Sequence, residues 1–241
     1  MTVRTGAVLD RLIRRCWLDA AADLASRGPS QDEFRGELTR ILEGQVPGDP
    51  THGAQGKTRT VLTHIWLRVP PSVRPLRDEA LGLFESASSG DRLALHWGMC
   101  LATYPFFRDL ATIIGRLLAL QGVAARGQIR RRATEQFGER TTIQRAVPTM
   151  IASLREWGVL VADGDGAFTC PVRPIASDAI QRWLIEAIFL ARTAEPVRFD
   201  DLARHPALFP FRHNLVLHDL RDHPRLEVFR LGVDDGMVAY K

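Results

Sequence analysis

The sequence predicts a mainly α-helical fold with small β-hairpins, and three observations carry this prediction. Apolar residues recur at steps of three and four along most of the chain, which is the helical period. Stretches rich in glycine and proline separate these helical segments. Two pairs of short β-prone runs flank glycine-containing turns and predict hairpins. We therefore expect a helical N-terminal unit over residues 1–104, a winged helix-turn-helix over 105–172, and a second, degenerate winged-helix-like module over 177–241.

The composition is that of an ordinary globular chain. Of the 241 residues, 45% are apolar and 25% are charged, which excludes the disordered and fibrous classes. No run approaches the roughly 20 apolar residues of a membrane span, and the sequence starts without the apolar stretch of a secretory signal. We therefore expect a cytoplasmic protein with no membrane partner. The three cysteines lie far apart, which indicates neither a disulfide framework nor a structural zinc site.

Five helical segments are predicted in the N-terminal unit. They cover residues 6–27, a stretch that opens at Ser30, a stretch that ends at Pro70, and residues 72–88 and 91–103. Ser30 and Glu33 form a capping-box pattern at the start of the second helix. Residues 44–56 combine glycine, proline and polar side chains, and they predict an exposed loop before the third helix.

A helix-turn-helix is predicted in the next unit. Its first helix covers residues 105–121 and ends at Gly122, and its second covers residues 127–137. Residues 138–140 form a short turn, after which Thr141 or Thr142 can cap a third helix. The apolar residues of that third helix repeat at steps of four and three: Ile143, Val147, Met150, Leu154 and Trp157. Pro148 lies within this pattern, so we expect either a bend there or a helix that begins later.

A hairpin is predicted directly after the third helix. Residues 159–161 and 167–169 are short β-prone runs, and they flank a turn of alternating aspartate and glycine at residues 163–166. Three helices followed by a hairpin make the pattern of a winged helix-turn-helix.

The positive charge of the chain is concentrated in this same unit. Residues 122–160 carry seven arginines and three glutamates, an excess equal to the net charge of +4 of the whole chain. Such a local excess predicts a surface for a polyanion, with a solvated basic face as the alternative. Arginines of the second helix and the turn would neutralise phosphates, while the start of the third helix enters the major groove. The predicted DNA-binding residues are Arg126, Arg130, Arg131, Arg132, Arg140, Thr141, Thr142, Gln144, Arg145 and Thr149, with Lys57 and Arg59 as a secondary phosphate contact.

The C-terminal module repeats the order of helix, strand, helices and hairpin. The expected elements are a helix around residues 180–190, short helices over 200–205 and 212–222, and hairpin strands over 226–231 and 237–240. Residues 177–241 carry nine basic and ten acidic side chains. We therefore expect packing or partner binding from this module rather than phosphate binding.

No catalytic residue, cofactor site or metal site is predicted. Gly56-Lys57-Thr58 is similar to the end of a phosphate-binding loop, but Thr51 stands at the place of its first glycine and no apolar strand precedes it. The histidines at 213, 218 and 223 recur every five residues, a spacing that does not keep them on one helical face. We therefore expect a non-enzymatic protein without cofactor or metal.

Three segments resemble the small accessory protein A family of BREX phage-defence operons. They are QGKTRTVL at residues 55–62, LALHWGMCLATYPFFRD at 93–109 and LREWGVL at 154–160. The resemblance covers roughly residues 5–165. It implies a bacterial defence-island protein with a helical N-terminal part, DNA binding and no known enzymatic activity of its own. The long C-terminal extension of this chain departs from the family.

Three functions stay open on the sequence. The first is a DNA-binding accessory factor in antiviral defence, with double-stranded DNA and other defence-system proteins as expected partners. The second is a winged-helix transcriptional regulator, as a homodimer, that binds an operator with the same motif. The third is a scaffold that uses its winged-helix modules to bind protein partners only.

Overall fold

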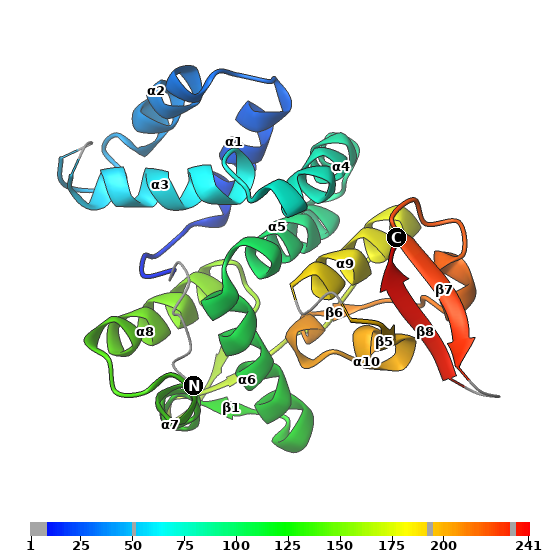
Figure 1. Ribbon diagram of the computed structural model, residues 1–241. Coiled ribbons are helices and arrows are strands. Elements are labelled where there is room, and N and C mark those ends of the chain that lie inside the picture. The colour runs from blue at the N-terminus through cyan, green and yellow to red at the C-terminus, as the bar shows by residue number, and fades with distance from the viewer. Residues whose placement is uncertain (1–8, 50–51, 192–194, 232–234) are drawn as a thin grey trace.

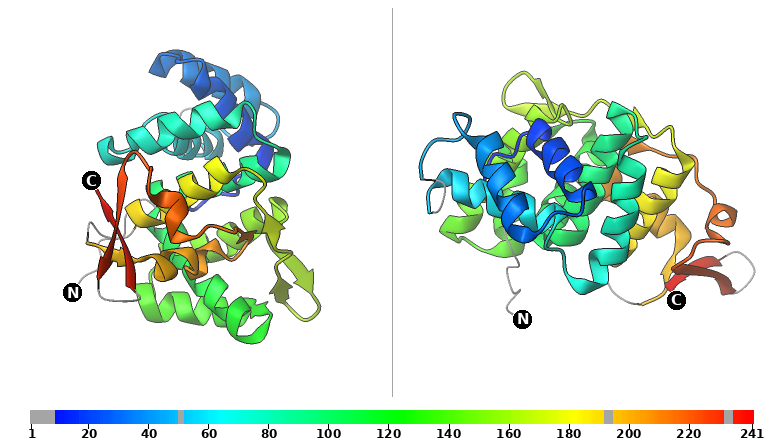
Figure 2. Two further views of the ribbon diagram at one scale, coloured as in Figure 1. Left: turned by 90° about the vertical axis from the view of Figure 1, so that its right-hand side faces the viewer. Right: turned by 90° about the horizontal axis from the view of Figure 1, so that it is seen from above.

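The computed structural model describes residues 9–49, 52–191, 195–231 and 235–241, which form a mainly helical fold with three small sheets (Figure 1). Helices α2 and α3 lie at one end of the molecule and α7 at the other, with α5 between them (Figures 1 and 2). No helix in these ranges is long and apolar enough to cross a membrane.

The first part of the chain forms helices, as predicted. They are α1 (Arg15–Ser26), α2 (Gln31–Leu42), α3 (Ala54–Trp66), the 3-10 turn η1 (Pro71–Val73), α4 (Arg74–Phe84) and α5 (Ser89–Thr103). The capping box at the start of α2 is confirmed, because Ser30 accepts a hydrogen bond from the Glu33 amide and donates its own amide to the Glu33 carboxylate. The loop predicted to reach residue 56 ends earlier, since α3 begins at Ala54 and buries Gln55 and Gly56.

The prediction of a helix from residue 6 is wrong for residues 9–14, and residues 1–8 lie outside the described ranges. Residues 9–14 instead form a non-helical segment, which we call the N-terminal strap. The strap buries Leu9 and Ile13, two residues that the helical spacing had included. It packs on α8, where the Ile13 amide donates to Ser153 Oγ at 3.0 Å and Trp157 Nε1 donates to the Ile13 carbonyl at 2.8 Å.

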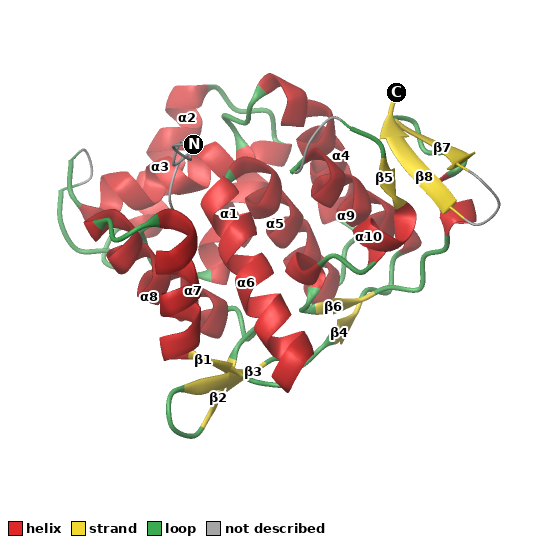
Figure 3. Ribbon diagram, turned by 60° about the horizontal axis from the view of Figure 1, so that its bottom comes forward, coloured by secondary structure: helices red, strands yellow, loops and turns green. Residues whose placement is uncertain are grey.

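The middle of the chain has the predicted order of helices and hairpin, with one additional strand. The elements are α6 (Pro105–Gln121), β1 (Ala124–Ala125), α7 (Arg126–Phe137), α8 (Thr141–Glu156), β2 (Val161–Asp163) and β3 (Ala167–Thr169). Gly122 ends α6 with φ 74°, a left-handed conformation that favours glycine. Strand β1 pairs with β3, Ala124 opposite Phe168, so the sheet order is β1-β3-β2 (Figure 3).

The last part of the chain repeats this arrangement with shorter helices. It contains β4 (Arg173–Pro174), α9 (Asp178–Leu190), β5 (Val197–Arg198), α10 (Phe199–Ala203), η2 (Pro206–Leu208), β6 (Phe211–Arg212), η3 (Leu217–Leu220), β7 (Leu226–Leu231) and β8 (Asp235–Tyr240). The sheet order is β5-β8-β7, so here too the first strand pairs with the last. The helix expected over residues 212–222 is wrong: that segment holds only the end of β6 and the single turn η3. The turn of the second hairpin falls on residues 232–234, outside the described ranges.

One hydrophobic core runs through all three predicted units. Trp97 on α5 donates to the Ala207 carbonyl at 2.9 Å, and Trp183 on α9 donates to the Leu76 carbonyl at 2.8 Å. Close helix packing depends on two glycines: a Cβ at Gly98 would lie 2.4 Å from the Trp183 ring, and one at Gly115 would lie 1.9 Å from the Pro206 carbonyl oxygen. The predicted unit boundaries stay predictions, since the core is continuous across them.

Candidate nucleic-acid interface

Helix α7 packs against both α6 and α8, and its apolar face is buried. Ile129, Ala133 and Phe137 of α7 are buried, and the Phe137 ring lies 5.2 Å from that of Phe106 on α6. Gly138 follows with φ 79° and lets the chain turn sharply into α8. The packing therefore fixes the start of α8 at the surface directly after the turn.

The exposed face of α8 carries no acidic side chain before the last residue of the helix, Glu156. Four exposed residues repeat on this face at steps of four and three: Thr141, Arg145, Pro148 and Ala152. The sequence between Thr141 and Arg155 contains no aspartate or glutamate. Arg145 and Arg155 have no carboxylate partner among the described residues. The sequence prediction missed Arg155, although its position seven residues after Pro148, about two helical turns, places it near the same face.

The start of α8 is open as well as exposed. Arg140 is the N-cap residue and makes no side-chain capping hydrogen bond, so the predicted capping role of Thr141 or Thr142 is wrong. The backbone amides of the first turn of a helix have no acceptor within the helix, and they carry a partial positive charge. Thr142 and Gln144 are also exposed at this end of α8 and can donate hydrogen bonds. The preceding turn exposes one carboxylate nearby, that of Glu139.

The run Arg130–Arg131–Arg132 is split by helix geometry. Consecutive residues point about 100° apart around a helix, so the three side chains leave α7 in different directions. Arg132 lines a hollow toward α6, together with Arg116 and Leu117. Glu135 lies 3.2 Å from Arg132 and 3.8 Å from Arg131, so a carboxylate offsets part of their charge. Arg130 is exposed and has no such partner among the described residues.

The other predicted DNA-binding residues differ in exposure and do not lie on one surface. Arg126 lies over the Phe168 ring of β3 at 5.7 Å, which ties it to the sheet beside α7. Arg140 is exposed in the turn, and Thr149 is half-buried and donates to the Arg145 carbonyl. Lys57 is exposed, but Arg59 is only 7% exposed and donates to Thr39 Oγ1 on α2. Both residues belong to α3, at the opposite end of the molecule from α7 (Figure 1).

Two neighbouring segments limit what α8 can contact. The N-terminal strap covers the last turns of α8, where Ser153 and Trp157 bind it and Glu156 accepts from the Arg15 amide at 2.8 Å. The strap leaves the first turns uncovered. The turn of the β2–β3 hairpin exposes Asp163 and Asp165, two carboxylates that a phosphate backbone would repel.

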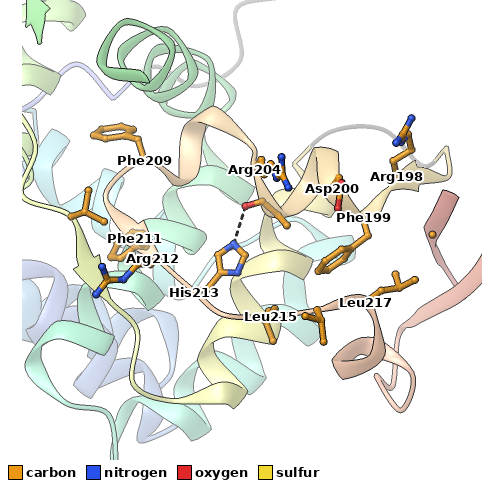
Figure 4. Close-up of a pocket in the computed structure, with 14 residues that line it drawn as sticks. Arg198, Phe199, Asp200, Arg204, Phe209, Phe211, Arg212, His213, Leu215 and Leu217 are labelled. Atoms are coloured by element: carbon orange, nitrogen blue, oxygen red, sulfur yellow. Dashed lines mark hydrogen bonds between the residues drawn. The ribbon is translucent and has the colours of Figure 1, made fainter. Parts of the chain in front are cut away.

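A larger hollow, of about 750 Å³, lies in the C-terminal part (Figure 4). Its walls include Phe199, Phe211 and Leu215, and His213 donates Nε2–H to the Ala203 carbonyl at 2.8 Å. Arg198 and Arg212 lie on opposite sides of it and do not converge (Figure 4). This geometry does not provide a phosphate cradle. No group of three potential metal ligands occurs among the described residues.

The chain has no match among protein-family models, curated proteins or solved structures.

Proposed function

We propose that residues 105–172 form a winged helix-turn-helix that binds duplex DNA through the start of α8. The order helix, strand, helix, helix, hairpin supports this proposal, as does the pairing of β1 with the far strand of the hairpin. In this arrangement α8 is the helix that would enter the major groove, and β2–β3 is the wing.

The observation that carries the proposal is the exposed face of the first turns of α8, where Arg145 has no carboxylate partner among the described residues and no acidic side chain occurs between Thr141 and Arg155. A surface that approaches a polyanion gains from every counterion that it releases and loses from every carboxylate that it brings close. Within this proposal Arg145, Gln144 and Thr142 reach base edges or phosphates, and Arg130 and Arg140 contact phosphates. Arg132 lies toward α6 and beside Glu135, so we expect a smaller contribution from it.

The acidic turn of the β2–β3 hairpin limits how this unit can approach DNA. Wings commonly lie along the backbone or the minor groove, but Asp163 and Asp165 would oppose that contact. We therefore expect α8 and the preceding turn to make most of the contact, with the wing held away from the phosphates.

The resemblance of the sequence to the BREX accessory protein A family supports a proposal for the biological role. We propose a non-enzymatic accessory factor of phage defence that binds DNA with little sequence preference. An operator-binding regulator would instead prefer the promoter of its own gene strongly over an unrelated duplex, so affinities for these two duplexes separate the roles.

The salt dependence of DNA affinity tests the interface. The double variant Arg130→Ala/Arg145→Ala removes two unpaired guanidinium groups, so the slope of log affinity against log salt should become shallower by about 2. The measurement is fluorescence anisotropy of a labelled duplex over a range of salt concentrations.

The matched control is Arg221→Ala/Arg230→Ala, which removes two exposed arginines of the C-terminal part. This control should keep the slope of the unmodified protein. Equal slopes for the two double variants would remove Arg130 and Arg145 from the DNA interface.

A further inference from the structure

A second concentration of positive charge lies between α2 and α3, away from the helix-turn-helix. It surrounds a hollow of about 210 Å³. The basic residues that line the hollow are Arg35 from α2, Arg59 and His64 from α3, and Arg68 just after α3. No aspartate or glutamate lines it.

Arg59 is the most deeply placed of these residues. It is 7% exposed, and its Nη1 donates to Thr39 Oγ1 at 2.7 Å. Its remaining N–H groups have no acceptor among the described residues, and no carboxylate there forms an ion pair with Arg35, Arg59 or Arg68. The guanidinium group faces the hollow without a counter-charge, so an anion from outside the chain would be attracted to it.

The electrostatics of the hollow agree with its geometry. Burial lowers the pKa of Arg59, and the charge of Arg35 lowers it further. Burial likewise lowers the pKa of His64, and the nearby charge of Arg68 adds to the effect. The like charges of Arg35 and Arg59 therefore face one small space and would both attract an anion placed there, whereas the lowered pKa leaves His64 uncharged near neutral pH.

We propose that this hollow binds an oxyanion of the phosphate class through the guanidinium groups of Arg35, Arg59 and Arg68. Forked guanidinium donors match the oxygens of a phosphate. The threonines of the hollow add no donor, because Thr60 and Thr63 already donate their hydroxyl hydrogens to helix carbonyls.

The size of the hollow limits the ligand. Its volume lies below the roughly 300–1,000 Å³ of pockets that enclose drug-sized ligands, so it suits one phosphate group rather than a whole nucleotide. That group can be a free phosphate or a phosphate of a nucleic-acid backbone. The proposal does not depend on DNA binding by α8.

Thermal unfolding of the full chain tests the site with inorganic phosphate as the probe. At matched ionic strength and near-neutral pH, phosphate in place of chloride should raise the melting temperature by roughly 3–5 °C once its concentration is about ten times the Kd. The variants Arg35→Gln and Arg68→Gln remove exposed side chains, so both should fold, and each should reduce or abolish the rise. Arg40→Gln, on the same helix but outside the hollow, should keep it.

No rise in the unmodified protein, or an equal rise in all three variants, would overturn the proposal. The affinity of Arg68→Gln for duplex DNA then identifies the source of the phosphate. Weaker DNA binding would indicate a backbone phosphate, and unchanged binding a free phosphate. Loss of DNA binding in Arg130→Ala/Arg145→Ala should leave the phosphate-dependent rise intact, so failure of one proposal does not imply failure of the other.

Discussion

At the scale of single residues, one buried carboxylate connects three parts of the chain. Glu186 on α9 is 0% exposed, and both of its oxygens accept hydrogen bonds from Arg225 at 2.6 Å. Arg225 also binds Glu79 on α4, and His223 Nε2 lies 3.5 Å from Glu186. The two carboxylates raise the pKa of Arg225, so this guanidinium stays charged. The cluster therefore attaches the start of β7 to two helices.

Substitution of Arg225 alone should destabilise the folded protein far more than substitution of Arg225 and Glu186 together. Arg225→Met leaves Glu186 buried without its cation and should lower the free energy of unfolding by about 3–5 kcal/mol. The double variant Arg225→Met/Glu186→Leu should recover much of that loss, because the charge that remains without its partner, Glu79, is partly exposed to solvent. Urea denaturation measures both, and a double variant as unstable as the single one would contradict this explanation.

At the scale of elements, close backbone approach decides where glycine is required. Gly115 lets α6 pack directly on η2, because a side chain there would overlap the Pro206 carbonyl. We expect Gly115→Ala to lower the free energy of unfolding by more than about 2 kcal/mol, since the two elements must separate. Gly82 in the exposed part of α4 has open space at its Cβ position, so Gly82→Ala should raise that free energy by about 0.5–1 kcal/mol. Similar effects of the two substitutions would exclude a tight α6–η2 contact.

The elements also explain which sequence predictions held. The capping box of α2 and the end of α6 at Gly122 depend on interactions within a few residues, so the sequence was sufficient for both. The N-terminal strap was predicted as a helix because Leu9 and Ile13 have helical spacing, but their partners lie on α8, some 140 residues away. A sum of charges counts Arg132 and Arg59 like every other arginine. Only the structure shows that Arg132 lies toward α6 and that Arg59 lies against Thr39 of α2.

At the scale of the whole molecule, buried histidines make stability depend on pH. His96 is 0% exposed and lies 3.0 Å from Asp19, and burial, the largest influence, lowers its pKa. Burial also lowers the pKa of His223. The unfolded chain binds protons to these histidines below about pH 6.5, whereas the folded chain resists them. The folded state should therefore lose stability as the pH falls below that value.

Chemical denaturation at pH values above and below about 6.5 measures this loss of stability. We expect a lower free energy of unfolding on the acidic side, with a contribution from His96 of up to about 1.4 kcal/mol for one pH unit. His96→Gln should flatten the profile, while substitution of the exposed His52 by alanine should leave it unchanged. A protein that became more stable between pH 7 and 5.5 would contradict this assignment.

The central claim is that the first turns of α8 contact duplex DNA, and hydrogen–deuterium exchange tests it most directly. The first amides of α8 have no acceptor within the helix, so they should exchange quickly in the free protein. With a duplex at low salt, we predict slower exchange in peptides that cover residues 138–147, and little change in peptides of α10 and β7. Protection confined to the C-terminal part, with none at the start of α8, would contradict the account.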